Sequence, residues 1–223
     1  MTDPPTTDLP ITDPPTRIVA VAPERLAGWV ERFGVRHGAL RVDWTPESVV
    51  VSAPDGAEAT IEVPFPPLPP GPEPLTILFG HVLVPRRVGA LLVRKGGYAV
   101  GVFVGTELIS SKVGSAYVQG KTKAGGWSQQ RYARRRANQT DQAYAEAADV
   151  AATLLLPELE RLEALVGGGD RVGVHAVLGD PRLERLRPLL REPVLPTADP
   201  RLRILQAFPE QFRAVRIGLN GLA

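Results

Sequence analysis

A proline-rich segment divides this chain into two parts. Seven prolines fall between residues 64 and 74. Proline has a fixed φ and no amide hydrogen to donate, so such a segment does not easily join a sheet or a helix. We therefore predict a stiff extended connector over residues 64–74, with a domain boundary near residue 70. At 223 residues the chain can bury a core and could form either one domain with an appendage or two small domains.

The part before the connector has the pattern of a small α+β unit. Residues 1–16 repeat Thr-Asp-Pro-Pro-Thr and offer little to bury, which predicts a disordered tail. Residues 17–63 alternate short apolar runs with turn residues. We expect a helix that starts after Pro23 and ends at Gly34, and strands over 18–21, 40–44, 48–52 and 59–63.

Residues 75–223 are expected to form the larger unit, in which helices pack on a mixed central sheet, so the predicted fold class is α/β (α+β). Three β-rich runs are spaced like an antiparallel meander, and an alanine-rich run that follows Ser128 as N-cap predicts a long helix as far as Pro157. The expected strands are 88–94, 98–104, 107–113, 171–177 and 212–219; the expected helices are 130–156 and 158–166, with further N-caps at Asp180 and Asp199.

Several classes of chemistry are disfavoured by composition. The chain has no cysteine, which excludes disulfides, thiolate catalysis and zinc ribbons. Its three histidines, His37, His81 and His175, lie far apart with no metal-binding spacing, so we expect neither a metal nor an organic cofactor. The sequence shows no signal peptide, and arginines interrupt its most apolar region, so a cytoplasmic monomer without a membrane partner is expected.

The most uneven charge distribution is a long segment without acidic residues. No Asp or Glu occurs between Glu107 and Asp141, whereas the remaining chain carries five more acidic than basic residues. A solvated helix face normally mixes Glu with Arg, so a polyanion is the better explanation for this segment. Its basic residues are Lys112, Lys121, Lys123, Arg131, Arg134, Arg135 and Arg136.

Two familiar catalytic motifs do not fit the same segment. Gly120-Lys121-Thr122 matches the end of a phosphate-binding P-loop, but the first glycine of that motif would have to stand where Ser115 is. A nucleophile elbow is also absent. What remains is a pair of glycines, Gly125 and Gly126, followed closely by Gln129 and Gln130. A glutamine can orient water and donate hydrogen bonds, which suits ester hydrolysis in a site that RNA largely supplies.

The segment resembles the release-factor-like peptidyl-tRNA hydrolases, in particular their actinobacterial branch. These are related to the ribosome quality-control peptidyl-tRNA hydrolase of eukaryotes and to the catalytic domain of eukaryotic and archaeal class-one release factors. The resemblance depends on residues 112–115 and 120–139, and it extends over roughly 17–219. Release factors have a contiguous Gly-Gly-Gln, whereas Trp127 and Ser128 intervene here, so the backbone geometry differs.

The resemblance implies a role for each part of the segment. Gln129 would be the catalytic glutamine, with Gln130 as the alternative, and Gly125 and Gly126 would give the backbone freedom to enter the site. Trp127 is a candidate for stacking on bases. The candidates for rRNA and tRNA phosphate contacts are Lys121, Lys123, Arg131, Arg134, Arg135 and Arg136, of which Arg131, Arg134 and Arg135 share one helical side.

The resemblance therefore implies a codon-independent release factor. It would free nascent chains from tRNA on stalled large ribosomal subunits, as part of ribosome-associated quality control, and its partners would be rRNA and peptidyl-tRNA. Two alternatives use the same basic segment. One is a non-catalytic rRNA- or tRNA-binding protein; the other is a tRNA endonuclease, although the acid-free segment offers no general base or metal carboxylate nearby.

Overall fold

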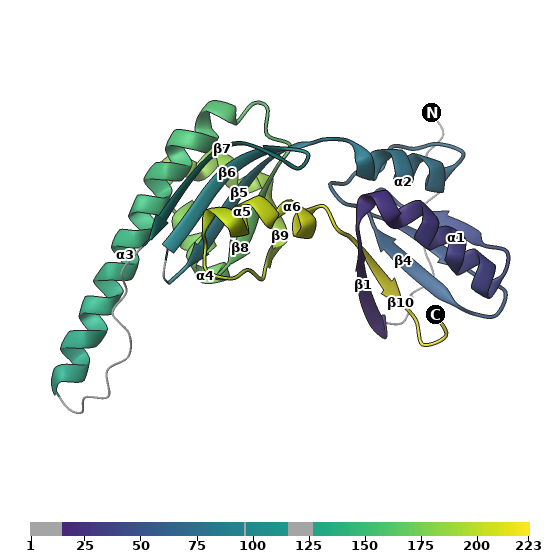
Figure 1. The fold of residues 1–223 in the computed structure, drawn as a ribbon, viewed down its shortest axis with the longest axis horizontal. Helices are drawn as coiled ribbons and strands as arrows, with labels where there is room; N and C mark the ends of the chain where they lie inside the picture. Colours follow the sequence, from purple (N-terminus) through teal and green to yellow (C-terminus); the bar gives the residue numbers. More distant parts are fainter. Residues whose placement is uncertain (1–14, 96, 116–126) are drawn as a thin grey trace, which may run out of the picture. The chain divides into compact units, whose positions relative to one another are not determined.

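The computed structural model describes residues 15–95, 97–115 and 127–223, without the side chains of 127–139. The chain folds as two compact units, which Figure 1 shows with the helices and strands labelled. Unit 1 comprises Met1–Val84 together with Arg213–Ala223, and unit 2 comprises Pro85–Phe212. Each unit has a five-stranded sheet of its own.

Unit 1 is an antiparallel sheet with two helices. Its strand order is β1-β10-β4-β3-β2, and α1 and α2 contribute side chains to the same core as the strands. Buried and exposed residues alternate along β3 and β4, which is the pattern of a sheet with one face covered. The elements are β1 (Arg17–Val21), a 3-10 helix η1 (Pro23–Arg25), α1 (Leu26–His37), β2 (Arg41–Trp44), β3 (Ser48–Ser52), β4 (Glu58–Glu62), α2 (Pro74–Leu83) and β10 (Val215–Leu219).

Helix α1 does not end at Gly34, so that expectation is wrong. It continues to His37 and ends at Gly38, whose φ of 106° lies in the left-handed region that favours glycine. The amide of Gly38 donates to the carbonyl of Gly34 at 2.8 Å. A Cβ at Gly34 would touch Leu40 at 3.4 Å, so this glycine lies where the helix approaches the following loop.

The division into units differs from the boundaries expected at 17–63, 64–74 and 75–223. The proline-rich segment is irregular as predicted, but its Leu68 is only 2% exposed and belongs to the core of unit 1, as do residues of α2. The predicted last strand exists as β10, but it lies between β1 and β4 in unit 1. The expected tail, 1–16, lies outside the described residues apart from Pro15 and Thr16.

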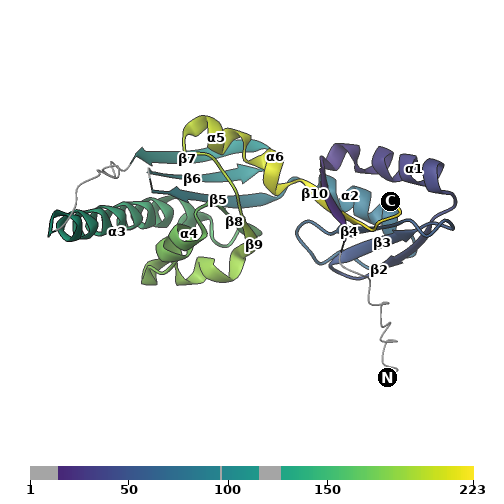
Figure 2. The ribbon, with the colours of Figure 1, turned by 90° about the horizontal axis from the view of Figure 1, so that it is seen from below.

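Unit 2 has the predicted mixed sheet with packed helices, in the order β7-β6-β5-β8-β9. The meander β5–β6–β7 is antiparallel, whereas β8 runs parallel to β5 and β9 parallel to β8. Helices α3 and α4 cover one face and α5 the other (Figure 2). The elements are β5 (Arg87–Arg94), β6 (Gly97–Val104), β7 (Glu107–Ser115), α3 (Trp127–Leu155), η2 (Leu156–Glu158), β8 (Ala164–Gly169), α4 (Arg171–Leu178), η3 (Pro181–Leu189), β9 (Leu190–Leu195), α5 (Leu202–Ala207) and α6 (Pro209–Phe212).

The assignments after α3 are partly reversed. The predicted helix over 158–166 and strand over 171–177 are wrong, because Ala164–Gly169 is strand β8 and Arg171–Leu178 is helix α4. Asp170, between them, caps α4 by accepting a hydrogen bond from the amide of Val172 at 3.0 Å. Asp180 caps η3 as predicted, whereas Asp199 does not cap α5, which begins at Leu202.

Candidate functional site

The last residue that the structure describes before 116–126 is Ser115, which ends β7 at one edge of the unit 2 sheet. Residues paired across the sheet at this edge are Gly97 with Ser115, Gly97 with Arg94, and Val93 with Gly169. The carboxyl ends of β5, β7, β8 and β9 therefore meet there. In sheets with parallel strands, this is the edge at which ligand sites commonly lie.

Close packing fixes the last residues of β7 before the segment begins. A Cβ added at Gly114 would approach the phenol oxygen of Tyr98 to 2.5 Å, and a Cβ at Gly97 would overlap the carbonyl oxygen of Gly114. Only glycine fits at either position while these neighbours stay in place. The point at which 116–126 begins is thus held against β6.

Tyr98 links this point to helix α3. Its side chain is 7% exposed and belongs to the same core cluster as Ala147 and Ala151 of α3. Burial raises the pKa of Tyr98, and the negative charges of Glu146 and Asp149 raise it further. The phenol therefore stays neutral at physiological pH and acts as packing at the base of the segment.

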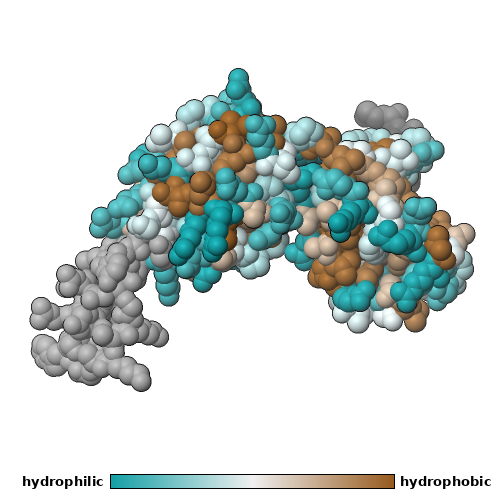
Figure 3. Space-filling model, viewed as in Figure 1, coloured by the Kyte–Doolittle hydropathy of each residue, from teal (hydrophilic) through white to brown (hydrophobic). Residues whose placement is uncertain are grey.

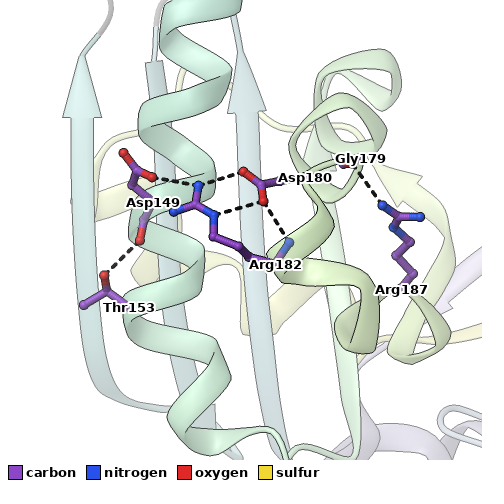
Figure 4. A network of polar contacts seen from close by, with 6 residues as sticks. All are labelled: Asp149, Thr153, Gly179, Asp180, Arg182 and Arg187. Atoms are coloured by element: carbon purple, nitrogen blue, oxygen red, sulfur yellow. Dashed lines mark hydrogen bonds and ion pairs between the residues drawn. The ribbon is translucent and has the colours of Figure 1, made fainter.

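The carboxyl half of α3 is anchored on unit 2. Buried alanines recur every fourth residue at Ala143, Ala147 and Ala151, which packs this side of α3 on β6. Arg182 of η3 joins Asp149 of α3 to Asp180, with both N–O distances at 2.7 Å (Figure 4). The guanidinium of Arg182 and its backbone amide together lower the pKa of Asp180 to about 2.

The amino half of α3 continues past the sheet (Figure 1). Tyr144 lies at the edge, where a Cβ at Gly173 would meet its phenol oxygen at 3.1 Å. At a rise of about 1.5 Å per residue, the helical backbone from Tyr144 to Trp127 spans about 25 Å. The four arginines of the acid-free segment, Arg131, Arg134, Arg135 and Arg136, thus belong to the part of α3 that continues past the sheet.

The predicted site residues fall mostly outside what can be described. Lys121, Lys123, Gly125 and Gly126 lie outside the described residues. The others lie in helix α3, where the structure describes their backbone but not their side chains; they are Trp127, Gln129, Gln130, Arg131, Arg134, Arg135 and Arg136. Because α3 begins at Trp127, Ser128 lies within the helix and the expected N-cap is wrong.

Sequence analysis missed a cavity at the same edge. It has a volume of about 440 Å³ and is lined by residues that include Arg94, Lys95, Asp170, Thr197 and Asp199. Arg94 donates to the carbonyl of Thr197 at 2.8 Å and lies 3.6 Å from a carboxylate oxygen of Asp199. The hydroxyl of Thr197 is buried and has no hydrogen-bond partner among the described residues. In the sequence, the signal that could have indicated this cavity is the pair of adjacent basic residues Arg94 and Lys95.

The described residues contain neither a candidate metal site nor a candidate membrane-spanning helix. No group of three or more histidine, aspartate or glutamate side chains there could hold a metal ion. Within the same part of the chain, no helix has the length and apolar character needed to span a membrane.

Comparisons with known proteins point to translation. A family model described as "Actinobacteria/chloroflexi VLRF1 release factor" matches residues 86–218, which is more than half of the chain. No curated protein matches. Among solved structures, the archaeal translation termination factor aRF1 is similar with a TM-score of 0.43 and 17% identity, covering 73% of this chain and 51% of its own. A second archaeal protein has a TM-score of 0.35 and 16% identity, covering 70% and 47%. The chain thus spans about half the length of these structures.

Proposed function

The chain belongs to the actinobacterial and chloroflexi VLRF1 release-factor family, and on this premise we propose that it hydrolyses the ester bond of peptidyl-tRNA on the large ribosomal subunit. One observation carries the proposal. Residues 116–126 connect Ser115, at the fixed end of β7, to Trp127, where the helix that extends beyond the sheet edge begins. A segment attached in this way is suited to entering a cavity made of RNA.

Gln129 is the proposed catalytic residue. A glutamine side chain is neither an acid nor a base at physiological pH, so its contribution is to orient water toward the ester carbonyl and to donate hydrogen bonds. Gly125 and Gly126 let the backbone approach the substrate closely. rRNA and tRNA supply the remaining surroundings, and the mechanism requires no metal or organic cofactor from the protein.

The basic residues are proposed to neutralise phosphates along the path into the subunit. Lys121, Lys123, Arg131, Arg134, Arg135 and Arg136 occupy a stretch with no carboxylate, so their charges gain most from an anionic partner. The cavity at the sheet edge adds no net positive charge, because Asp170 and Asp199 line it together with Arg94 and Lys95. The alanine face in the carboxyl half of α3 is buried against β6. The sheet would therefore fix the position of the basic residues in the amino half of the same helix.

The first prediction tests the catalytic role of Gln129. Isolated large subunits carrying labelled peptidyl-tRNA are mixed with wild type, Gln129→Ala or Gln130→Ala. We expect Gln129→Ala to release peptide about 100-fold or more slowly, because loss of a positioning group costs about this much. Its affinity for subunits should stay within about twofold of wild type, since the change leaves all charges in place.

Gln130→Ala is the matched control, because it removes the same amide from the neighbouring position. Release that depends on Gln130 and not on Gln129 would transfer the role to Gln130. Subunit binding without release by wild type would favour a non-catalytic RNA-binding protein. A shortened tRNA product, in place of intact tRNA with a free 3′ end, would identify a nuclease.

A further inference from the structure

Unit 1 contains a cavity that the proposed hydrolase function does not use. It has a volume of about 340 Å³ and lies where α1 meets β1 and β10. Its lining includes Arg17, Trp29, Arg32, Phe33, Arg36 and His37. Three of these residues are cationic and three are aromatic.

The spacing of residues along α1 builds the aromatic side. Trp29, Phe33 and His37 recur every fourth residue, so they form one row on the helix. The rings of Trp29 and Phe33 stack with centroids 5.4 Å apart, and those of Phe33 and His37 lie 4.7 Å apart. Phe33 and His37 are nearly buried, whereas Trp29 is half-buried and leaves part of its indole accessible.

The cationic side combines one helix with the edge of the sheet. Arg32 and Arg36 are one turn apart on α1, and Arg17 lies on β1 opposite Leu219 of β10. Like charges one turn apart on a helix repel each other. In Figure 3, hydrophilic and hydrophobic residues lie side by side on the surface of unit 1.

None of Arg17, Arg32 and Arg36 forms an ion pair with a carboxylate of the described residues. His37 does, with Asp55 at 2.8 Å. Three other arginines of unit 1 are paired, since Arg41 contacts Asp43, Arg213 contacts Glu24 and Arg216 contacts Glu62, whereas Arg25 also has no ion pair among the described residues. The cavity, which Leu219 and Ala223 also line, therefore combines three arginines that form no ion pair among the described residues with a half-buried indole.

We propose that this cavity binds a nucleotide of single-stranded RNA, with a phosphate at the arginines and the base against Trp29. Guanidinium groups match phosphate oxygens with two parallel hydrogen bonds, and bases stack on aromatic side chains in single-stranded RNA sites. An acidic peptide could satisfy the charge, but its carboxylates would not use the indole. The cavity volume is near the lower end for small-ligand sites, which fits one nucleotide better than a duplex.

The experiment must distinguish this cavity from the basic segment of unit 2, which is also expected to bind RNA. The full chain is irradiated with a short single-stranded oligouridine and then cleaved after glutamate. Residues 25–31 form the peptide that carries Trp29, and its cleavage sites after Glu24 and Glu31 persist in every arginine variant. We expect a cross-link in this peptide for wild type.

Substitution of the arginines supplies the quantitative test. Arg17→Gln and Arg36→Gln are each expected to weaken binding measured by this cross-link three- to tenfold, and to lower the salt dependence by about 0.7 in log–log slope. Arg25→Gln is the control, because it removes one charge from an exposed position in unit 1 that does not line the cavity. Its affinity should stay within about twofold of wild type.

Three results would overturn the proposal. The first is the absence of the cross-link at residues 25–31, and the second is an equal loss in the Arg25→Gln protein. The third is displacement of the RNA from this peptide by a polyglutamate at the same concentration of charge, which would indicate an acidic protein partner. Peptide release by the wild-type protein is measured in parallel, so failure here is distinguishable from failure of the proposed hydrolase.

Discussion

Gly114 of β7 faces Tyr98 of β6, one residue before β7 ends at Ser115. The Tyr98 ring occupies the space that a side chain at position 114 would need. Since Tyr98 is buried in the core that also holds α3, it has little freedom to move aside. The chemistry proposed for Gln129 thus depends on Gly114 as well as on the glycine pair Gly125 and Gly126.

The second prediction concerns Gly114→Ala. The added methyl group should force Tyr98 out of its position and reduce the free energy of unfolding by about 1–3 kcal/mol, as overpacked cores generally do. Denaturant unfolding measures this change. Replacing Tyr98 by Leu in the same chain should restore part of the loss, because the two residues are in contact.

A matched glycine provides the control for that experiment. Gly80 lies in α2, and a Cβ there would meet nothing within 4 Å. Gly80→Ala should therefore leave stability unchanged or raise it by up to about 1 kcal/mol, because alanine is the better helix former. Equal losses for the two variants would contradict the packing explanation.

At the scale of elements, local patterns predicted the meander and the long helix but not the order that follows α3. Alternation and glycine spacing placed β5, β6 and β7 within two residues of their observed bounds. The run Ala164–Gly169 is too short and too apolar to distinguish a buried strand from a helix by periodicity. Its pairing with β5 decides the matter, and that contact is distant in sequence.

The glycines at the end of β8 have a packing role that sequence patterns could not reveal. A Cβ at Gly167 would come to 3.0 Å from Val174 of α4, and one at Gly168 to 3.1 Å from Phe208, which directly follows α5. They allow α4 and α5 to approach the two faces of the sheet closely. Sequence analysis interpreted them as the end of a helix, which is the commoner use of glycine.

The third prediction concerns the link between α3 and η3. Because the folded-state pKa of Asp180 is lowered to about 2, its carboxylate adds stability above its ordinary pKa of 3.8, and this stability is lost as pH falls toward 2. Asp180→Asn keeps a capping side chain but removes the charge. We expect the Tm difference between wild type and Asp180→Asn to be largest above about pH 5 and to disappear near pH 2.

Arg187→Gln is the control for the pH dependence. Arg187 belongs to the same element, but it donates to the carbonyls of Leu178 and Gly179, at 2.6 and 3.0 Å, and these carbonyls do not titrate (Figure 4). Its effect on Tm should stay constant between about pH 5 and pH 2. A Tm difference for Asp180→Asn that does not change with pH would show that the carboxylate charge contributes nothing to the link.

At the scale of the whole molecule, unit 1 is assembled from both ends of the chain. Strand β10 pairs with β1 on one side and with β4 on the other, so residues 215–219 complete a sheet begun 200 residues earlier. The sequence predicts a strand over 212–219, but no local pattern indicates which sheet a strand joins. For this reason the expected boundary assigned 213–223 to unit 2.

The last prediction follows from this topology. Ile217 is fully buried in the central part of the unit 1 sheet, paired with Val19 and Ile61. Ile217→Ala should destabilise unit 1 by about 2–5 kcal/mol, because it removes buried methyl groups and leaves a cavity. Hydrogen exchange followed by mass spectrometry resolves the two units. Since the cores of the two units are separate clusters, exchange should accelerate in β1, β3 and β4 and stay unchanged in β5 and β6.

Leu91→Ala, in the core of unit 2, should give the reverse pattern. Acceleration in both units by either variant would mean that the chain unfolds as one cooperative body, and β10 would then couple the site proposed in unit 1 to the one proposed in unit 2.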